Sequence, residues 1–62
     1  MFRKVMVKCT NSVGGRFDEN KFYVMEINDD YNIVRSQSGF IKINKDTLEY
    51  RKPNEQYIFE RT

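Results

Sequence analysis

The stretch from Lys21 to Arg35 constrains the fold more than any other part of the sequence. Two runs rich in β-branched and aromatic residues flank the polar cluster Asn-Asp-Asp-Tyr-Asn. This pattern predicts a β-hairpin, because Asn and Asp tolerate left-handed backbone angles and hydrogen-bond their own main chain. Side chains alternate along the first run, and one face carries Tyr23, Met25 and Ile27. The other face carries Phe22, Val24 and Glu26. Both faces hold large side chains, so we predict a central strand.

The N-terminal segment, residues 2–10, also alternates as a strand does. Val5, Val7 and Cys9 share the face that we predict to be buried. Cys9 is accordingly interpreted as a small core residue rather than a reactive thiol. The opposite face carries Lys4, Met6, Lys8 and Thr10.

Two strands are predicted in the second half of the chain. In residues 40–43, Ile41 and Ile43 are expected to face the core. Phe40 and Lys42 alternate with them and are expected to face outward or towards the rim. Residues 55–61 follow Pro53, which cannot donate to a strand ladder, and alternate again. Tyr57 and Phe59 share one face of that segment, opposite Gln56, Ile58 and Glu60.

Loops separate these strands. In the loop 11–20, Gly14 and Gly15 supply positive backbone angles at little steric cost. We expect Phe17, in the same loop, to fold back onto the barrel as a lid, with an exposed ligand contact as the alternative. A second tight turn is predicted at residues 36–39.

The segment 44–48 allows two interpretations. Asn44 or Asp46 could cap a single helical turn, with Leu48 tucked inward. The alternative is a short strand that ends at Tyr50 and Arg51. The sequence does not decide between them.

Short strands divided by turn signals indicate an all-β fold. Five strands in a chain of 62 residues favour a small antiparallel barrel, because closure hides the edges that a flat sheet would expose. We predict a single domain over residues 1–62. The predicted core consists of Val5, Val7, Tyr23, Met25, Ile27, Ile33, Ile41, Ile43 and Leu48.

Composition excludes several functional classes. The net charge of +2 is far from the basic excess of an electrostatically driven nucleic-acid binder. A single Cys and no His exclude an internal disulfide and a finger-type zinc site, and we expect neither a metal nor a cofactor. No apolar run reaches membrane-spanning length, so we predict a cytoplasmic protein that does not enter membranes.

Several motifs resemble those of short SH3-like barrel proteins of bacteriophages and prophages. Val7-Lys8-Cys9 matches the end of the opening strand, and residues 20–25 match the Gly-Lys-x-Tyr-x-Val strand, with Asn20 in place of Gly and Met25 in place of Val. Ser38-Gly39 matches a later turn, and Leu48 the inward residue after a one-turn helix. The resemblance covers residues 5–50 and implies an SH3-like barrel encoded by a phage. The aromatic pair and Pro that bind proline-rich ligands in signalling SH3 domains have no counterpart here.

The residue inventory argues against an enzyme, since the chain offers no His and no Cys-His or Ser-His pair. We therefore predict a binding module, monomeric or homodimeric, that docks on a larger host protein and regulates or inhibits it. The alternative is a barrel that binds single-stranded nucleic acid through aromatic side chains interleaved with cations. The candidate binding residues are Arg16, Phe17, Tyr31, Arg35, Phe40, Lys42, Tyr57 and Phe59.

The C-terminal segment 57–59 is the strongly apolar stretch beyond Pro53. We predict that it pairs with the strand at residues 2–10. Its outer face would then contribute to a dimer or partner interface. The alternative is simple closure of the barrel without an interface.

Overall fold

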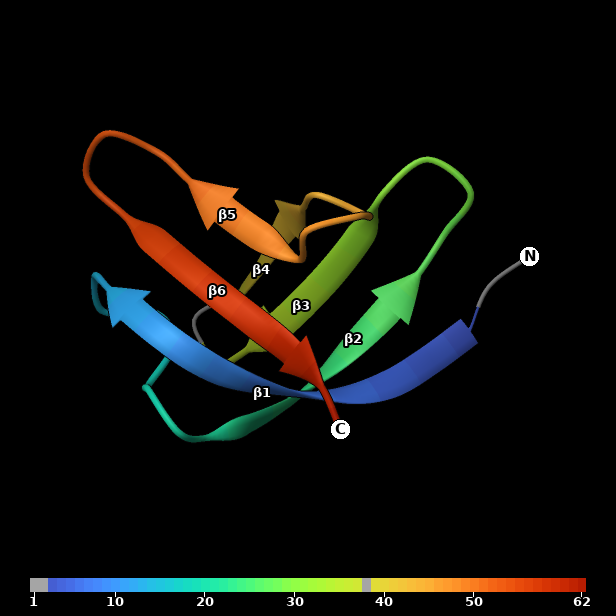
Figure 1. Ribbon diagram of the computed structural model, residues 1–62, viewed down its shortest axis with the longest axis horizontal. Helices are drawn as coiled ribbons and strands as arrows, with labels where there is room; N and C mark the ends of the chain where they lie inside the picture. Colours follow the sequence, from blue (N-terminus) through green and yellow to red (C-terminus); the bar gives the residue numbers. More distant parts are fainter. Residues whose placement is uncertain (1–2, 38) are drawn as a thin grey trace.

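Six antiparallel strands form one sheet that curls into a nearly closed barrel (Figure 1). The computed structural model describes residues 3–37 and 39–62. Its strands are β1 (Arg3–Val13), β2 (Phe22–Ile27), β3 (Asn32–Ser36), β4 (Gly39–Ile43), β5 (Glu49–Arg51) and β6 (Gln56–Arg61). They lie in the order β4-β3-β2-β1-β6-β5. The predicted small antiparallel barrel is confirmed, but it has six strands rather than five. None of the described residues forms a helix long and apolar enough to cross a membrane.

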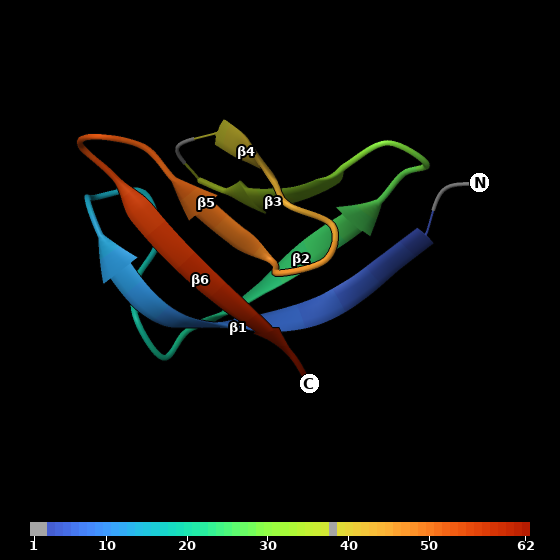
Figure 2. The same ribbon diagram turned by 45° about the horizontal axis from the view of Figure 1, so that its top comes forward.

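The long strand β1 joins the two halves of the barrel. Its first part, Arg3–Lys8, pairs with β2, and its second part, Val7–Val13, pairs with β6. The register with β6 shifts between Cys9 and Asn11, as in a β-bulge, which bends a strand and increases its twist. Figures 1 and 2 show the curved β1 beneath β6 and β5 on one side and β2 and β3 on the other.

The predicted hairpin at Lys21–Arg35 is confirmed as β2 and β3. The Asn28 N–H donates to the Tyr31 carbonyl at 3.1 Å and closes the turn. The register places Val34 beside Met25 and Ile33 beside Glu26. Val34 therefore faces the core, and the prediction that Ile33 does so is wrong. Ile33 is buried on the opposite face of the sheet, outside the core cluster.

The core lies between the two halves of the curled sheet. Its buried residues are Val7, Cys9, Phe17, Met25, Val34, Ile41, Ile43, Tyr57 and Phe59. Partly buried hydrophobic residues pack against them, namely Val5, Tyr23, Ile27, Leu48 and Tyr50. Apart from Ile33, every predicted core residue thus lies in or against this cluster. The sequence reasoning did not include Val34, Phe17, Tyr57 and Phe59 in the core.

Elements of both interpretations of residues 44–48 occur in the structure. The Asn44 Oδ1 accepts hydrogen bonds from the N–H groups of Asp46 and Thr47 at 2.8 and 3.0 Å, so the segment is a capped turn. It is followed directly by β5, and this short strand accounts for the sixth strand. The Asn44 N–H donates to the Glu49 carbonyl at 3.1 Å and joins the two edge strands at this end of the barrel.

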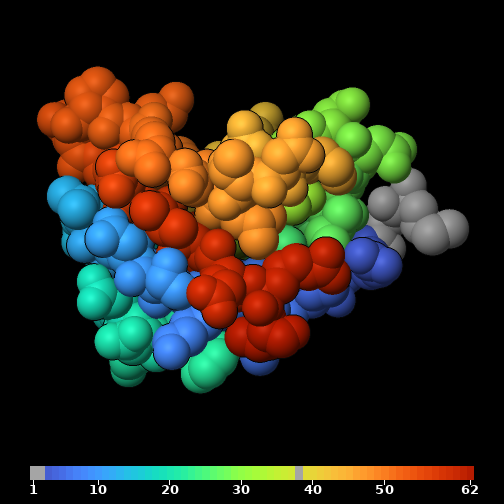
Figure 3. All heavy atoms as spheres, in the orientation of Figure 1, coloured from blue at the N-terminus to red at the C-terminus, as the bar shows by residue number. Residues whose placement is uncertain are grey.

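The C-terminal strand β6 lies between β1 and β5, as predicted for a segment that pairs with the first strand. Its partner is the second half of β1 rather than residues 2–10 as a whole. Tyr57 and Phe59 point into the core, whereas Ile58 is half-buried. β6 thus connects β1 to the edge strand β5, and in the space-filling view it runs across the front of the molecule (Figure 3).

Candidate docking surface on the outer face of β1 to β4

The outer face of β1–β4 exposes a set of large hydrophobic side chains. They alternate with the core residues of the same strands, so they point away from the barrel interior. Their exposed fractions range from 41% for Val24 to 58% for Phe22. We call this set the apolar stripe; it consists of Met6, Phe22, Val24 and Phe40. Such side chains gathered on one face are typical of an interaction surface.

The strand registers place three residues of this stripe, Met6, Val24 and Phe40, in one row, with Arg35 between Val24 and Phe40. Met6 is the cross-strand partner of Val24, and Phe40 is the partner of Arg35. The pairing of β2 with β3 at Met25 and Val34, continued by one residue, places Val24 beside Arg35. One row of side chains therefore crosses all four strands.

Cations border the apolar stripe. We call this set the basic border; it consists of Lys4, Lys8, Arg35 and Lys42. The Arg35 guanidinium carbon lies 5.4 Å from the centre of the Phe40 ring. The Lys42 ammonium lies 4.6 Å from the centre of the Tyr31 ring, at the end of the β2–β3 turn. Both are cation–π contacts that hold a positive charge next to an aromatic ring.

Glu26 is the carboxylate that β1–β4 carry on this face. Its side chain is 9% exposed and accepts hydrogen bonds from the Nε and Nη2 of Arg35, the latter at 3.3 Å. The hydrogen bond from Arg35 lowers the pKa of Glu26, and desolvation opposes this shift only in part. The same bond raises the pKa of Arg35. The pair fixes the Arg35 guanidinium in the middle of the row.

This pair should make stability depend on acid pH. Because the pKa of folded Glu26 lies below its ordinary value of 4.5, its stabilisation is present above pH 4.5 and is lost as the pH falls through the lowered pKa. We expect Glu26→Gln to lower stability at neutral pH and to flatten the decline below pH 4.5. Urea unfolding at several pH values measures both effects, and Arg35→Gln should also flatten the decline. Parallel pH profiles for the wild type and Glu26→Gln would contradict this assignment.

Four of the eight predicted binding residues lie together on or beside this surface. Phe40 and Lys42 point outward from β4, as predicted, and Arg35 lies beside Phe40. Tyr31 joins them through its contact with Lys42.

The other four predicted binding residues lie elsewhere. Tyr57 and Phe59 alternate with Gln56 and Ile58 along β6 and lie on its inward face, and they are 0% and 3% exposed. Phe17 is 1% exposed, and its ring meets those of Tyr57 and Phe59 at 5.0 and 5.4 Å. The Arg16 guanidinium forms an ion pair with Glu55 at 2.9 Å. Phe17, Tyr57 and Phe59 are therefore buried core side chains rather than exposed contacts, and a binding role for them, as for Arg16, stays a prediction.

Sequence reasoning missed three residues of the apolar stripe. The outward direction of Met6 was predicted, and Phe22 and Val24 were placed on one face of their strand. The large side chains on that face were taken as a sign of a central strand, which β2 is. A central strand of a barrel still has one face toward solvent. The large side chains on that face of β2 could therefore have identified the surface.

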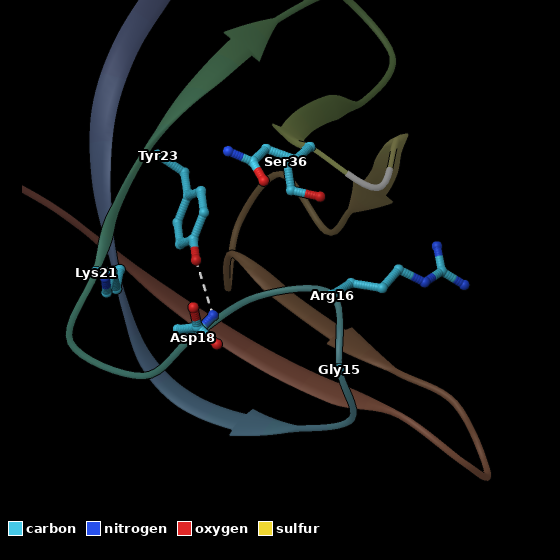
Figure 4. A pocket seen from close by; sticks show the side chains of 7 residues that line it. Gly15, Arg16, Asp18, Lys21, Tyr23 and Ser36 are labelled. Atoms are coloured by element: carbon cyan, nitrogen blue, oxygen red, sulfur yellow. Dashed lines mark hydrogen bonds between the residues drawn. The ribbon is translucent and has the colours of Figure 1, made fainter.

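A second feature is a polar recess between the β1–β2 loop and the β3–β4 turn. It has a volume of about 430 Å³ and is lined by Gly15, Arg16, Asp18, Lys21, Tyr23, Ser36 and Gln37. The Asp18 N–H donates to the Tyr23 hydroxyl at 2.8 Å, and Arg16 extends away from this pair (Figure 4). The charged groups of the recess do not converge on one point, so we assign it no ligand.

The described residues contain no group of three or more His, Cys, Asp or Glu side chains placed to hold a metal ion. Cys9 is fully buried, and this burial raises the pKa of its thiol. A thiol in that state is a poor nucleophile. The outer face of β1–β4 presents apolar side chains and positive charge.

A comparison with known proteins found no family model that matches the chain, no significantly similar curated protein and no significantly similar solved structure.

Proposed function

We propose that this protein is a non-catalytic binding module that docks on a larger protein through the outer face of β1–β4. The observation that carries the proposal is the apolar stripe, four large hydrophobic side chains between 41% and 58% exposed on one side of a 62-residue chain. Complete burial of a fully exposed side chain of this kind is worth roughly 1.5–3 kcal/mol, and these side chains, about half exposed, have about half of that to gain in an interface. Phe, Met and Arg side chains are also the types that are enriched in protein interfaces.

The module acts by binding to a surface of its partner. Its effect is therefore regulation or inhibition of that partner rather than catalysis of a reaction. The motif resemblance supports an SH3-like barrel encoded by a phage, which would make the partner a host protein. A single Cys, which can form no internal disulfide, fits the reducing host cytoplasm as the place of action.

Capture of a host protein should depend on the apolar stripe and not on exposed apolar side chains elsewhere on the barrel. We expect Val24→Ser to weaken the capture of a stoichiometric partner from host lysate at least 10-fold. Val13→Ser is the matched control, because Val13 is 55% exposed but lies at the far end of β1, which pairs there with β6. Quantitative mass spectrometry with each immobilised variant, followed by titration calorimetry with the purified partner, measures the difference. Equal capture by the wild type, Val24→Ser and Val13→Ser would refute docking through this face.

One observation favours a second candidate, the binding of single-stranded nucleic acid. Phe22 and Phe40 are exposed aromatic rings with Lys8 and Arg35 as their cross-strand partners, and aromatic rings beside cations form the platforms on which bases stack. Salt-dependent anisotropy of a labelled oligonucleotide tests it. Protein docking is preferred because Met6 and Val24, in the same stripe, give an aliphatic surface that does not stack with bases.

A further inference from the structure

We infer that the docking partner presents an apolar ridge bordered by carboxylates. This inference rests on the proposed function and specifies the chemistry of the partner surface. It starts from an uneven distribution of charge over the barrel. The outer face of β1–β4 carries the four cations of the basic border and one carboxylate, a net charge of +3. The remaining seven cationic and eight acidic side chains sum to −1. The overall charge of +2 thus conceals one basic face.

The placement of these cations matches an apolar ridge with acidic flanks. Lys8 is the cross-strand partner of Phe22, and Lys42 that of Ile33, on either side of the row that crosses the four strands. The Arg35 guanidinium lies within this row, beside Phe40. A partner that buries the apolar stripe brings its own flanking groups against these cations. Carboxylates opposite Lys8 and Lys42 gain charge-assisted hydrogen bonds, whereas apolar or basic flanks would bury these two ammonium groups without a carboxylate from the partner; Arg35 already has Glu26 as its partner.

The same contacts argue against nucleic acid as the occupant. Arg35 lies over the Phe40 ring and Lys42 over the Tyr31 ring, so a base that stacked on either ring would compete with an existing cation–π contact. A guanidinium over a ring still directs its N–H groups sideways, where a carboxylate can accept them. The contacts therefore favour an acidic protein surface.

A second copy of this chain fits less well. A symmetric dimer through the outer face would place one basic border against another, and like charges opposed in an interface are unfavourable. The complementary surface must come from a different molecule.

Two synthetic peptides and an oligonucleotide test the inference. The peptides are 18-residue amphipathic helices with the same leucine face; one has glutamate and the other lysine at the flanking positions, and the oligonucleotide is a 15-nucleotide oligo-dT. With fluorescein on each probe, we expect the full-length protein to bind the glutamate peptide at least 10-fold more tightly than either other probe. Its affinity should fall as salt is raised, because exposed charge pairs are screened.

Charge reversal supplies the control. Lys8→Glu combined with Lys42→Glu should abolish the preference for the glutamate peptide. Lys52→Glu, in the β5–β6 turn, changes the net charge without touching the basic border and should keep the preference. Equal or tighter binding of the lysine peptide would overturn the acidic assignment, and tighter binding of oligo-dT would replace it with nucleic acid. If neither peptide binds while Val24→Ser still abolishes host-protein capture, the acidic assignment falls and the proposed function stands.

Discussion

Gly14→Ala is expected to destabilise the protein by about 3 kcal/mol, close to the whole stability of a domain of this size. Gly14 has φ of +133°, a backbone conformation that side chains with a Cβ rarely adopt. A Cβ at this position would also overlap the Tyr57 hydroxyl and approach the Glu55 Cγ to 3.2 Å. Tyr57 is fully buried, so it cannot swing away. Its hydroxyl accepts the Arg16 N–H at 3.1 Å and donates to Glu55, and the overlap would strain both bonds.

Gly39 and Gly15 distinguish the two causes of this loss, the positive φ and the overlap of a Cβ with Tyr57. Gly39 also has a positive φ, +125°, but open space surrounds the position of its Cβ, so Gly39→Ala should show the backbone effect alone, about 1–2 kcal/mol. Gly15 has neither feature, and Gly15→Ala should stay within about 0.5 kcal/mol of the wild type. Urea unfolding followed by circular dichroism gives all three values.

The overlap has its own test. Tyr57→Phe removes the hydroxyl, so it should recover part of the stability that Gly14→Ala loses. Similar losses for Gly14→Ala and Gly39→Ala would mean that the contact with Tyr57 contributes nothing beyond the backbone conformation.

The strands were predictable because period-two alternation and turn residues are local signals. Lys21–Arg35 contains the two strands β2 and β3 of the predicted hairpin, and within the described residues the segments 2–10 and 40–43 lie in β1 and β4. The turn predicted at residues 36–39 joins β3 to β4 through the pairing of Ser36 with Gly39, while Ser38 lies outside the described residues.

The direction of some side chains could not be predicted locally. Ile33 and Val34 are adjacent and both β-branched, so alternation allows either to face the core. The pairing of β2 with β3 decides for Val34, because it places Val34 beside Met25. A one-residue difference in register exchanges the two faces of a strand, and this is a property of the pair rather than of either sequence.

The candidate surface was predictable only in part for the same reason. The outward positions of Phe40 and Lys42 followed from alternation in one strand. The row that leads from Met6 to Phe40 depends on the registers of β1–β4. These registers bring Met6 beside Val24 and Arg35 beside Phe40. Phe17 is the opposite case, since no periodicity applies in a loop and its burial depends on the aromatic rings of β2 and β6.

Phe17→Ala should unfold the protein, whereas Phe22→Ala should leave its stability nearly unchanged. Phe17 is 1% exposed, and its ring meets that of Tyr23 edge-on at 4.9 Å as well as those of Tyr57 and Phe59. Removal of a buried Phe side chain costs about 3–5 kcal/mol, as much as a domain this small has in total. Phe22 is 58% exposed on the outer face, and truncation of an exposed side chain changes stability by about 0.5 kcal/mol or less.

The matched pair also separates stability from binding. The Phe22→Ala protein should remain folded by circular dichroism and lose at least 10-fold in affinity for the captured partner, because its ring belongs to the apolar stripe. Phe17→Leu, which keeps most of the buried volume, should restore folding and bind like the wild type, because Phe17 does not reach the outer face. A folded Phe17→Ala protein that has lost only binding would return Phe17 to the binding site and remove it from the core.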